Sequence, residues 1–159
     1  MKKTLIVLLS VLGLSACKST PSTTSGEPFD NLLLQEAVLQ TSAWQPLQRI
    51  APRYPIDAAT SGKEGCATIE YVIMPDYQIH IMKIADSAGR IFEREAQLVI
   101  QRWNWQQLPA GLITEPVKTR TRFEFCLESE AGQCSAENLA ARSQCSGTDV
   151  LPSVGYRIQ

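Results

Sequence analysis

Hydrophobic and polar positions along the middle of the chain follow two periods. One stretch has apolar side chains at helical spacing, which predicts an amphipathic α-helix. Its apolar positions are Phe92, Ala96, Val99, Ile100 and Trp103. Three other stretches, 66–73, 78–83 and 117–127, alternate apolar and polar residues and predict half-buried strands. Pro75 and Asp76 separate the first two stretches, which favours an antiparallel hairpin. The order hairpin, helix, strand predicts an α+β fold, with a small three-stranded antiparallel sheet packed on one helix.

A broader apolar pattern precedes this core and runs from residue 29 to residue 39. Asp30 is well placed to accept the first backbone N–H groups of a helix. We therefore expect a helix there, within an N-terminal helical segment 29–46 that docks on the domain. Prolines then predict an extended connection up to Pro55, followed by one short turn of helix.

The first sixteen residues have the features of an export signal. Lys2 and Lys3 precede a run of about ten apolar residues, well short of the ~20 that a membrane-spanning helix needs. The ending Leu14-Ser15-Ala16-Cys17 resembles the lipobox of bacterial lipoproteins. That resemblance implies cleavage of residues 1–16 and a lipid anchor, such as palmitate-type acyl chains, on Cys17. The alternative is an ordinary signal peptide with an incidental cysteine. Lys18, in place of an aspartate, favours the periplasmic face of the outer membrane.

Residues 17–28 are expected to form a flexible, lipid-anchored tether. After the cysteine they contain only small, polar or turn-forming side chains, KSTPSTTSGEP. No later apolar segment is long enough to cross a membrane, so lipid is the expected anchor. Removing residues 1–16 also removes two lysines and no acid, which takes the net charge from −1 to −3. A mildly acidic chain without a basic block argues against a nucleic-acid partner.

The residue types that catalysis requires are not grouped in a recognisable pattern. The single histidine, His80, is expected on the outward side of a strand, in contact with solvent. The sequence contains neither a Gly-rich phosphate loop nor a cluster with metal-ligand spacing, so no enzyme, cofactor or metal is expected. Trp103 and Trp105 are expected to pack within the domain rather than to stack on a ligand.

Short motifs occur in a fixed order around the predicted elements. They are Pro52-Arg53-Tyr54-Pro55 with Ala58-Ala59, Gly62-Lys63-Glu64-Gly65, Gly89 with Phe92-Glu93-Arg94-Glu95-Ala96, and Trp103-Asn104-Trp105. Together with the last alternating strand they resemble the C-terminal domain of TonB, the periplasmic part of the energy transducer that contacts outer-membrane receptors. The resemblance covers residues 47–128 and leaves 129–159 as a C-terminal extension that bears cysteines. Members of the family have a glycine in the hairpin turn where this chain has Tyr77, so either the turn differs or Tyr77 is strained.

The resemblance implies an exposed edge on the third strand. Transducers use that edge to pair with a receptor's short N-terminal segment by main-chain hydrogen bonds. The matching positions are 117–124, and the candidate partner-binding residues are Lys118, Arg120, Arg122, Tyr54 and Pro55. A basic edge can guide a peptide, or its charges can simply protect the edge from unwanted pairing.

An even number of cysteines follows Cys17. They are Cys66, Cys126, Cys134 and Cys145. In an oxidising compartment four cysteines predict two disulfides, with three possible connectivities. In the fold that the resemblance implies, the first strand begins at Cys66 beside the end of the third strand at Cys126. We therefore expect Cys66–Cys126, which leaves Cys134–Cys145 provided that any helix between those two is short.

The expected function is that of a non-enzymatic periplasmic lipoprotein with a TonB C-terminal-like protein-interaction domain. Its expected partner is an outer-membrane protein of TonB-type transmembrane transport, with a TonB-dependent receptor bound by strand addition as the leading candidate. A transducer's transmembrane helix and Pro-rich spacer have no counterpart in the sequence, so partner binding without energy coupling is expected. The alternative is a structural envelope-assembly lipoprotein unrelated to active transport.

Overall fold

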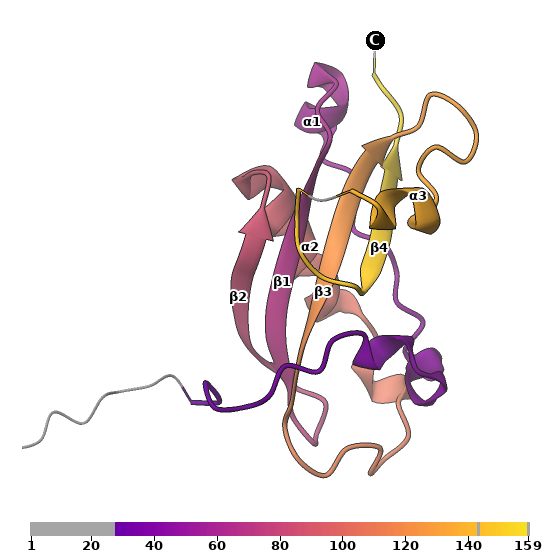
Figure 1. The fold of residues 1–159 in the computed structure, drawn as a ribbon. Coiled ribbons are helices and arrows are strands. Elements are labelled where there is room, and N and C mark those ends of the chain that lie inside the picture. The colour runs from indigo at the N-terminus through magenta and orange to yellow at the C-terminus, as the bar shows by residue number, and fades with distance from the viewer. Residues whose placement is uncertain (1–27, 143, 159) are drawn as a thin grey trace, which may run out of the picture.

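The computed structural model describes residues 28–142 and 144–158, which fold around one four-stranded sheet. The strands are β1 (Gly65–Ile73), β2 (Ile79–Ser87), β3 (Val117–Leu127) and β4 (Val150–Gly155), in the order β2-β1-β3-β4 (Figure 1). β1 is antiparallel to both β2 and β3, whereas β4 is parallel to β3. The α+β class and the three predicted strands are confirmed. The fourth strand comes from the C-terminal extension and was not predicted.

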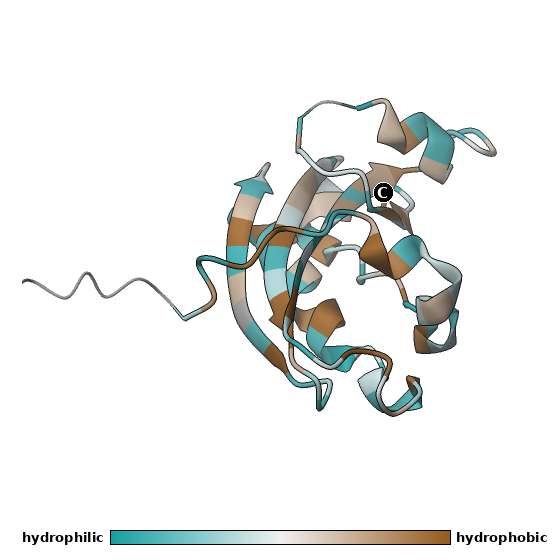
Figure 2. Cartoon of the chain, turned by 60° about the horizontal axis from the view of Figure 1, so that its bottom comes forward, coloured by the Kyte–Doolittle hydropathy of each residue, from teal (hydrophilic) through white to brown (hydrophobic). Residues whose placement is uncertain are grey.

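Helix α2 (Arg90–Arg102) covers one face of the sheet (Figure 1). Its buried residues, Phe92, Ala96, Val99 and Ile100, are those of the predicted apolar face. They pack against the alternating side chains of β1 and β3, so the main core lies between the helix and the sheet. Figure 2 shows the underlying pattern as hydrophobic and hydrophilic bands that alternate along the strands.

Two tryptophans close the end of this core, as predicted. Trp103 and Trp105 are buried, and their rings lie 5.6 Å apart. Both indole N–H groups donate to backbone carbonyls, of Ile50 and Ile100 respectively, at 2.8 Å. Trp105 begins the short 3-10 helix η3 (Trp105–Gln107) that leads away from α2.

The helix predicted over residues 29–39 is wrong. This segment forms turns and an isolated bridge from Leu34 to Lys118, and it is followed by the 3-10 helices η1 (Val38–Gln40) and η2 (Ser42–Leu47). Phe29 and Ala37 have positive φ angles of 78° and 57°, which an α-helix does not allow. This segment instead pairs with β3, where the amide of Gln35 donates a hydrogen bond to the carbonyl of Lys118 at 2.8 Å. Tertiary pairing has overridden the local apolar pattern.

Two short helices complete the architecture. α1 (Ile56–Ser61) directly follows Pro55, as predicted, and ends at Gly62, whose φ of 64° suits a glycine. α3 (Ala136–Ala140) begins at Ser135, whose hydroxyl accepts from the amide of Asn138 at 3.3 Å. Among the described residues, no helix is long and apolar enough to cross a membrane.

The hairpin turn between β1 and β2 is closed by a strained tyrosine. Tyr77 has a φ of 63°, in the region that glycine usually occupies. Its amide donates to the carbonyl of Met74, and its buried ring directs the hydroxyl to the carbonyl of Pro109. These contacts offset the strain of the positive φ angle at Tyr77.

The second face of the sheet is covered as well. We expected β1 to have one buried and one wetter face, but Cys66 and Thr68, which point away from α2, are fully buried. The C-terminal extension lies over this face at the upper end of the sheet, and residues 28–36 cross it at the lower end (Figure 1). The sheet is therefore the middle layer of the molecule rather than an outer wall.

Candidate functional site

The edge of β3 that the resemblance implies to be exposed is occupied by the chain itself. Residues 122–127 of β3 pair with residues 150–155 of β4. Nearer the start of β3, Gln35 bonds the carbonyl of Lys118, and the hydroxyl of Thr119 donates to the carbonyl of Gln35 at 2.8 Å. Both covering segments run parallel to β3. The expectation of a free edge at 117–124 is therefore wrong, because segments before and after the core return to the same strand.

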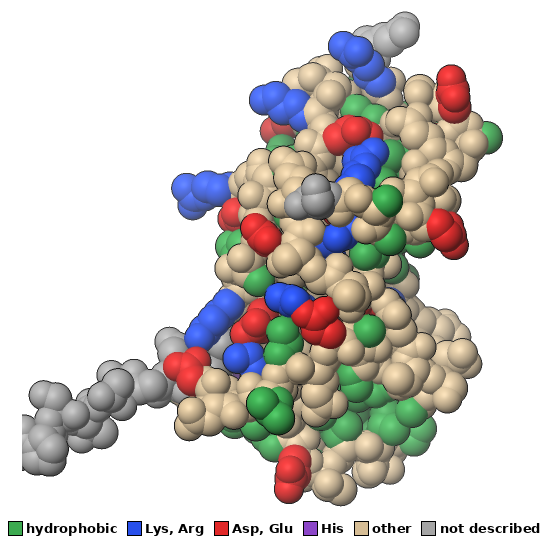
Figure 3. All heavy atoms as spheres, in the orientation of Figure 1, with side chains coloured by type: hydrophobic (Ala, Val, Ile, Leu, Met, Phe, Trp, Pro, Cys, Tyr) green, Lys and Arg blue, Asp and Glu red, His purple; other side chains and the backbone are tan. Residues whose placement is uncertain are grey.

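The three basic residues of the candidate edge lie on one face of β3, but each is paired within the chain. Lys118 lies 3.0 Å from Glu70, and Arg120 forms an ion pair with Glu36. Arg122 is only 4% exposed. Figure 3 views this side of the molecule, where acidic and basic side chains lie next to one another. The arrangement therefore stabilises the cover of the sheet rather than presenting free positive charge to a partner.

The side chain of Arg122 on β3 binds the backbone of the C-terminal extension. Its guanidinium donates to four carbonyl groups of that extension at 2.6–3.3 Å. They belong to Leu139, Ala140, Cys145 and Gly147. Its Nε also lies 2.9 Å from Glu124, without the alignment of a hydrogen bond. Burial raises the pKa of the Glu124 carboxyl above its ordinary value, while the nearby Arg122 charge opposes that rise.

Tyr54 lies against the C-terminal end of β4, and Pro55 follows it directly in the chain. Pro55 is buried, and the half-buried ring of Tyr54 packs edge-on against Phe125 with ring centres 6.0 Å apart. The Tyr54 ring also lies under Gly155, where an added Cβ would come within 2.5 Å of it. The phenol donates to the carbonyl of Lys63 at 2.6 Å, and burial, together with nearby Glu64, raises its pKa to about 12.

The same two residues also line an open hollow between the Tyr54–Asp57 stretch and helix α2. It has a volume of about 320 Å³, and its lining includes the exposed side chain of Ile56 together with Arg53, Arg94 and Arg102. Of the candidate partner-binding residues, Tyr54 and Pro55 thus line this open hollow, whereas Lys118 lines a much smaller one under residues 28–30.

A buried polar network fixes the start of β4. The Asp149 carboxylate, 2% exposed, accepts from Arg49 at 2.5 Å, from Thr121 at 2.8 Å and from Gln40 at 3.1 Å. Thr121 in turn is bonded to the buried hydroxyl of Tyr71 at 3.0 Å. Asp149 therefore ties β4 to the N-terminal 3-10 region and to the core side of β3.

The disulfide connectivity differs from the one expected. The structure contains Cys66–Cys145 and Cys126–Cys134, with Cα separations of 6.0 and 5.7 Å. The β1–β3 register explains the difference, because Cys66 lies opposite Glu124 and Cys126 falls two residues farther along. Cys66 instead meets the extension that covers its face. Cys126 and Cys134 lie near Glu64, but their disulfide leaves no thiolate to bind a metal.

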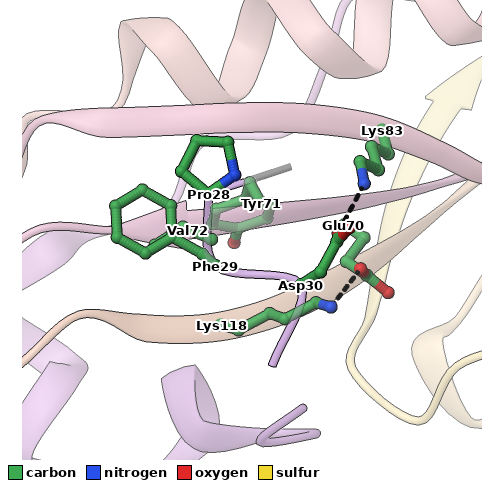
Figure 4. A pocket seen from close by; sticks show the side chains of 8 residues that line it. All are labelled: Pro28, Phe29, Asp30, Glu70, Tyr71, Val72, Lys83 and Lys118. Atoms are coloured by element: carbon green, nitrogen blue, oxygen red, sulfur yellow. Dashed lines mark hydrogen bonds and ion pairs between the residues drawn. The ribbon is translucent and has the colours of Figure 1, made fainter. Parts of the chain in front are cut away.

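Where residues 28–30 cross the sheet, they enclose a small hollow (Figure 4). The ring of Phe29 lies on one side, and Asp30 forms an ion pair with Lys83 at 3.1 Å on the other. The internal volume of about 10 Å³ is that of roughly one water molecule. The hollow is a narrow gap between residues 28–30 and the sheet, and it is too small for a ligand larger than water.

The remaining site predictions lie at other places in the chain. Cys17, the export signal 1–16 and all but the last residue of the tether 17–28 lie outside the described residues. His80 is exposed on β2, as expected. Sequence reasoning missed Asp149, Arg49 and Gly155, and no local pattern marks them, since their role depends on pairing between β3 and a strand more than twenty residues later.

Comparisons with known proteins match the middle of the chain. Residues 50–127 match the family described as Gram-negative bacterial TonB protein C-terminal. The chain is 29% identical over 85 residues to "Protein TonB" of Klebsiella pneumoniae, a match that takes in 52% of this chain and 35% of that protein. The chain therefore spans about a third of the length of this relative.

A solved structure of a TonB C-terminal domain also matches part of this chain. The solution NMR structure of the Pseudomonas aeruginosa TonB C-terminal domain matches with a TM-score of 0.47 and 25% identity, over 53% of this chain and 86% of that one. Residues 50–127 of this chain belong to the TonB C-terminal domain family.

Proposed function

We propose that this chain is a lipid-anchored lipoprotein of the periplasm whose TonB C-terminal-like domain binds a protein partner at the outer membrane. The family match over residues 50–127 carries this proposal, because the relative it resembles is a TonB protein. Partner binding, rather than catalysis or cofactor chemistry, is the role proposed for the domain. The partner belongs to TonB-type transmembrane transport, with a TonB-dependent receptor as the first candidate.

The closed edge of β3 supports a second candidate function. A partner strand reaches Lys118 or Arg120 only after residues 34–36 move, and it reaches Arg122 only after β4 moves. A domain that is closed in this way also suits a structural role in envelope assembly, unrelated to active transport. The two functions differ in the partner and in the surface that the partner touches.

Site-specific photo-crosslinking in whole cells distinguishes them. A photoreactive residue is placed at Lys118 on the covered edge, at Ile56 in the hollow beside Pro55, and at the exposed Glu137 of α3 as the control. The transport proposal expects capture of an outer-membrane receptor from Lys118 or Ile56 and not from Glu137. Capture of envelope-assembly proteins alone contradicts it and supports the structural alternative.

Metabolic labelling tests the lipid anchor separately. We expect labelled palmitate on the wild-type chain and none on Cys17→Ser, which is released from the membrane fraction. Cys66→Ser is the control, because it removes a cysteine that the structure places in a disulfide. Equal labelling of wild type and Cys17→Ser contradicts the anchor.

A further inference from the structure

We propose that the edge of β3 at residues 122–127 is a strand-docking site whose resident occupant is this chain's own segment 149–155. An external extended segment binds there only in competition with β4. The proposal rests on the function above in one respect, since it takes strand pairing as the way in which this domain meets a partner. The new part is the sequence pattern of the segment that this edge accepts, and the competition from β4 that excludes an external segment.

The backbone of β4 defines the orientation of the site. The amide of Arg122 donates to Asp149 at 2.8 Å, and the amide of Glu128 donates to Gly155 at 2.9 Å. Odd-numbered residues of β4 therefore turn their backbone groups toward β3, and even-numbered residues turn theirs away. Pro152, which has no N–H, falls on an even position, where none is needed for the β3 ladder. The site thus accepts a strand that runs parallel to β3.

The side chains of β4 define what the site accepts. Leu151 packs against the main core, and the hydroxyl of Ser153 donates to the carbonyl of Pro52 at 2.9 Å in a buried position. Gly155 lies where any Cβ would overlap the Tyr54 ring. Three alternate positions therefore require an apolar residue, a small hydroxyl residue and a glycine, in that order. A fitting partner is an extended segment with this pattern.

Two fixed points hold the resident strand in place. The Cys66–Cys145 disulfide joins the extension to β1 four residues before Asp149, and the Asp149 carboxylate is bound by Arg49, Thr121 and Gln40. Because Asp149 lies only four residues after Cys145, β4 has a local concentration at this edge of the order of millimolar. An external peptide of equal intrinsic affinity must exceed that concentration to displace it. The other end is held less firmly. After Gly155, Tyr156 is 68% exposed, and Ile158 makes one backbone bond to Ala59 at 3.4 Å.

Peptide binding to the full-length chain tests the proposal. The probe is a fluorescent peptide with the sequence of residues 148–159, and the host variant is Gly155→Val, whose side chain overlaps Tyr54 and dislodges the resident strand. We expect this variant to bind the peptide at least about 100-fold more tightly than the wild type does. A probe that itself carries valine at the position of Gly155 is the matched control and does not bind.

The result that overturns the proposal is equally defined. A Gly155→Val chain that keeps both disulfides and its near-ultraviolet tryptophan signal, yet binds the probe no better than wild type, contradicts it. Should that variant not fold, the wild-type chain cut at a protease site inserted between the exposed residues Ser146 and Thr148 decides instead. Its resident strand then exchanges for the labelled one, and failure to exchange contradicts the proposal. Because this assay uses no cellular partner, it can fail while the crosslinking succeeds, and the reverse.

Discussion

Two glycines allow elements of this domain to approach more closely than any side chain would permit. Gly155 lies against the ring of Tyr54, and Gly65, at the start of β1, lies against the ring of Phe92 on α2. An added Cβ at Gly65 would come within 2.3 Å of that ring. Neither glycine has a positive φ angle, so close packing rather than backbone conformation requires them.

The substitution Gly65→Ala is therefore expected to destabilise the fold. Phe92 is 3% exposed and packs on Phe125 with ring centres 4.9 Å apart, so it has little room to move. Overpacking of this kind costs about 1–3 kcal/mol in the free energy of unfolding, measurable by urea titration. The double variant with Phe92→Leu is the control, because a smaller side chain makes room. Strictly additive losses in the double variant would contradict the steric cause.

Tyr54 makes stability depend on pH in the alkaline range. Burial, and secondarily Glu64, raises its pKa from 10.0 to about 12, so the folded state holds the phenol proton more tightly than the unfolded state does. Unfolding then releases a proton between these values, and the free energy of unfolding falls as the pH rises from about 10 toward 12. Tyr54→Phe should show a smaller fall in urea titrations at pH 9, 10 and 11. Parallel curves for the two proteins would show that Tyr54 does not contribute.

At the scale of elements, the C-terminal extension differs most from a sequence-based expectation. The core strands and α2 were predictable because the alternation or helical spacing of their apolar side chains is visible in the local sequence, although β1 is buried on both faces. β4 has six residues, includes Pro152, and becomes a strand only when β3 provides its partner. Leu33, part of the pattern that predicted an N-terminal helix, is 86% exposed. Its apolar character therefore carried no information about burial.

The candidate site was predictable to a similar degree. The motif around Tyr54 and Pro55 was found from the sequence, and it does reach a concave surface. The basic residues on β3 were also found, but their acidic partners Glu36 and Glu70 lie on other elements that only the fold brings close. Local sequence predicts which residues share a strand, whereas long-range pairing decides whether their charges are free.

The two disulfides should contribute unequally to stability. Cys66–Cys145 spans 79 residues and Cys126–Cys134 spans 8, and the loss of chain entropy on crosslinking grows with loop length. Replacing both cysteines of the long pair by serine should cost about 4 kcal/mol, and replacing those of the short pair about 2–3 kcal/mol. Urea titration of the two double variants measures the difference. A larger loss from the short pair would contradict this order. Non-reducing peptide mapping checks the connectivity itself.

At the scale of the whole molecule, all sides of the sheet are protected. α2 covers one face, and the two flanking segments cover the other. β4 ends the sheet on one side with Pro152 in the edge strand, and β2 ends it on the other with two shifts of register against β1. Proline and irregular pairing both discourage the addition of another strand. The molecule is thereby protected from unregulated association through its edges.

Glu36 connects the N-terminal segment that crosses the sheet to β3 and to the residues that precede β4. It forms an ion pair with Arg120 on β3 and accepts from the hydroxyl of Thr148, which leads into β4. Glu36→Gln should loosen the crossing segment, so that the amide of Gln35 exchanges with deuterium faster, at a cost of at most about 1 kcal/mol in global stability, because the pair is partly exposed. Glu115→Gln, on an exposed loop, is the control. Unchanged exchange at Gln35 would show that backbone pairing alone holds the segment.

The nested order of the cysteine pairs has a consequence for how the protein matures. The first cysteine after Cys17 joins the last, and the two between them join each other. A chain that enters an oxidising compartment from its N-terminus presents Cys66 and Cys126 before Cys145 arrives, so the earliest available bridge is a non-native one. In chains that form that bridge, native pairing requires thiol–disulfide exchange, in which a free cysteine thiolate attacks the non-native disulfide. We expect the yield of native protein to depend on a disulfide isomerase, and oxidation without one to trap a fraction of the chains in the wrong pairing.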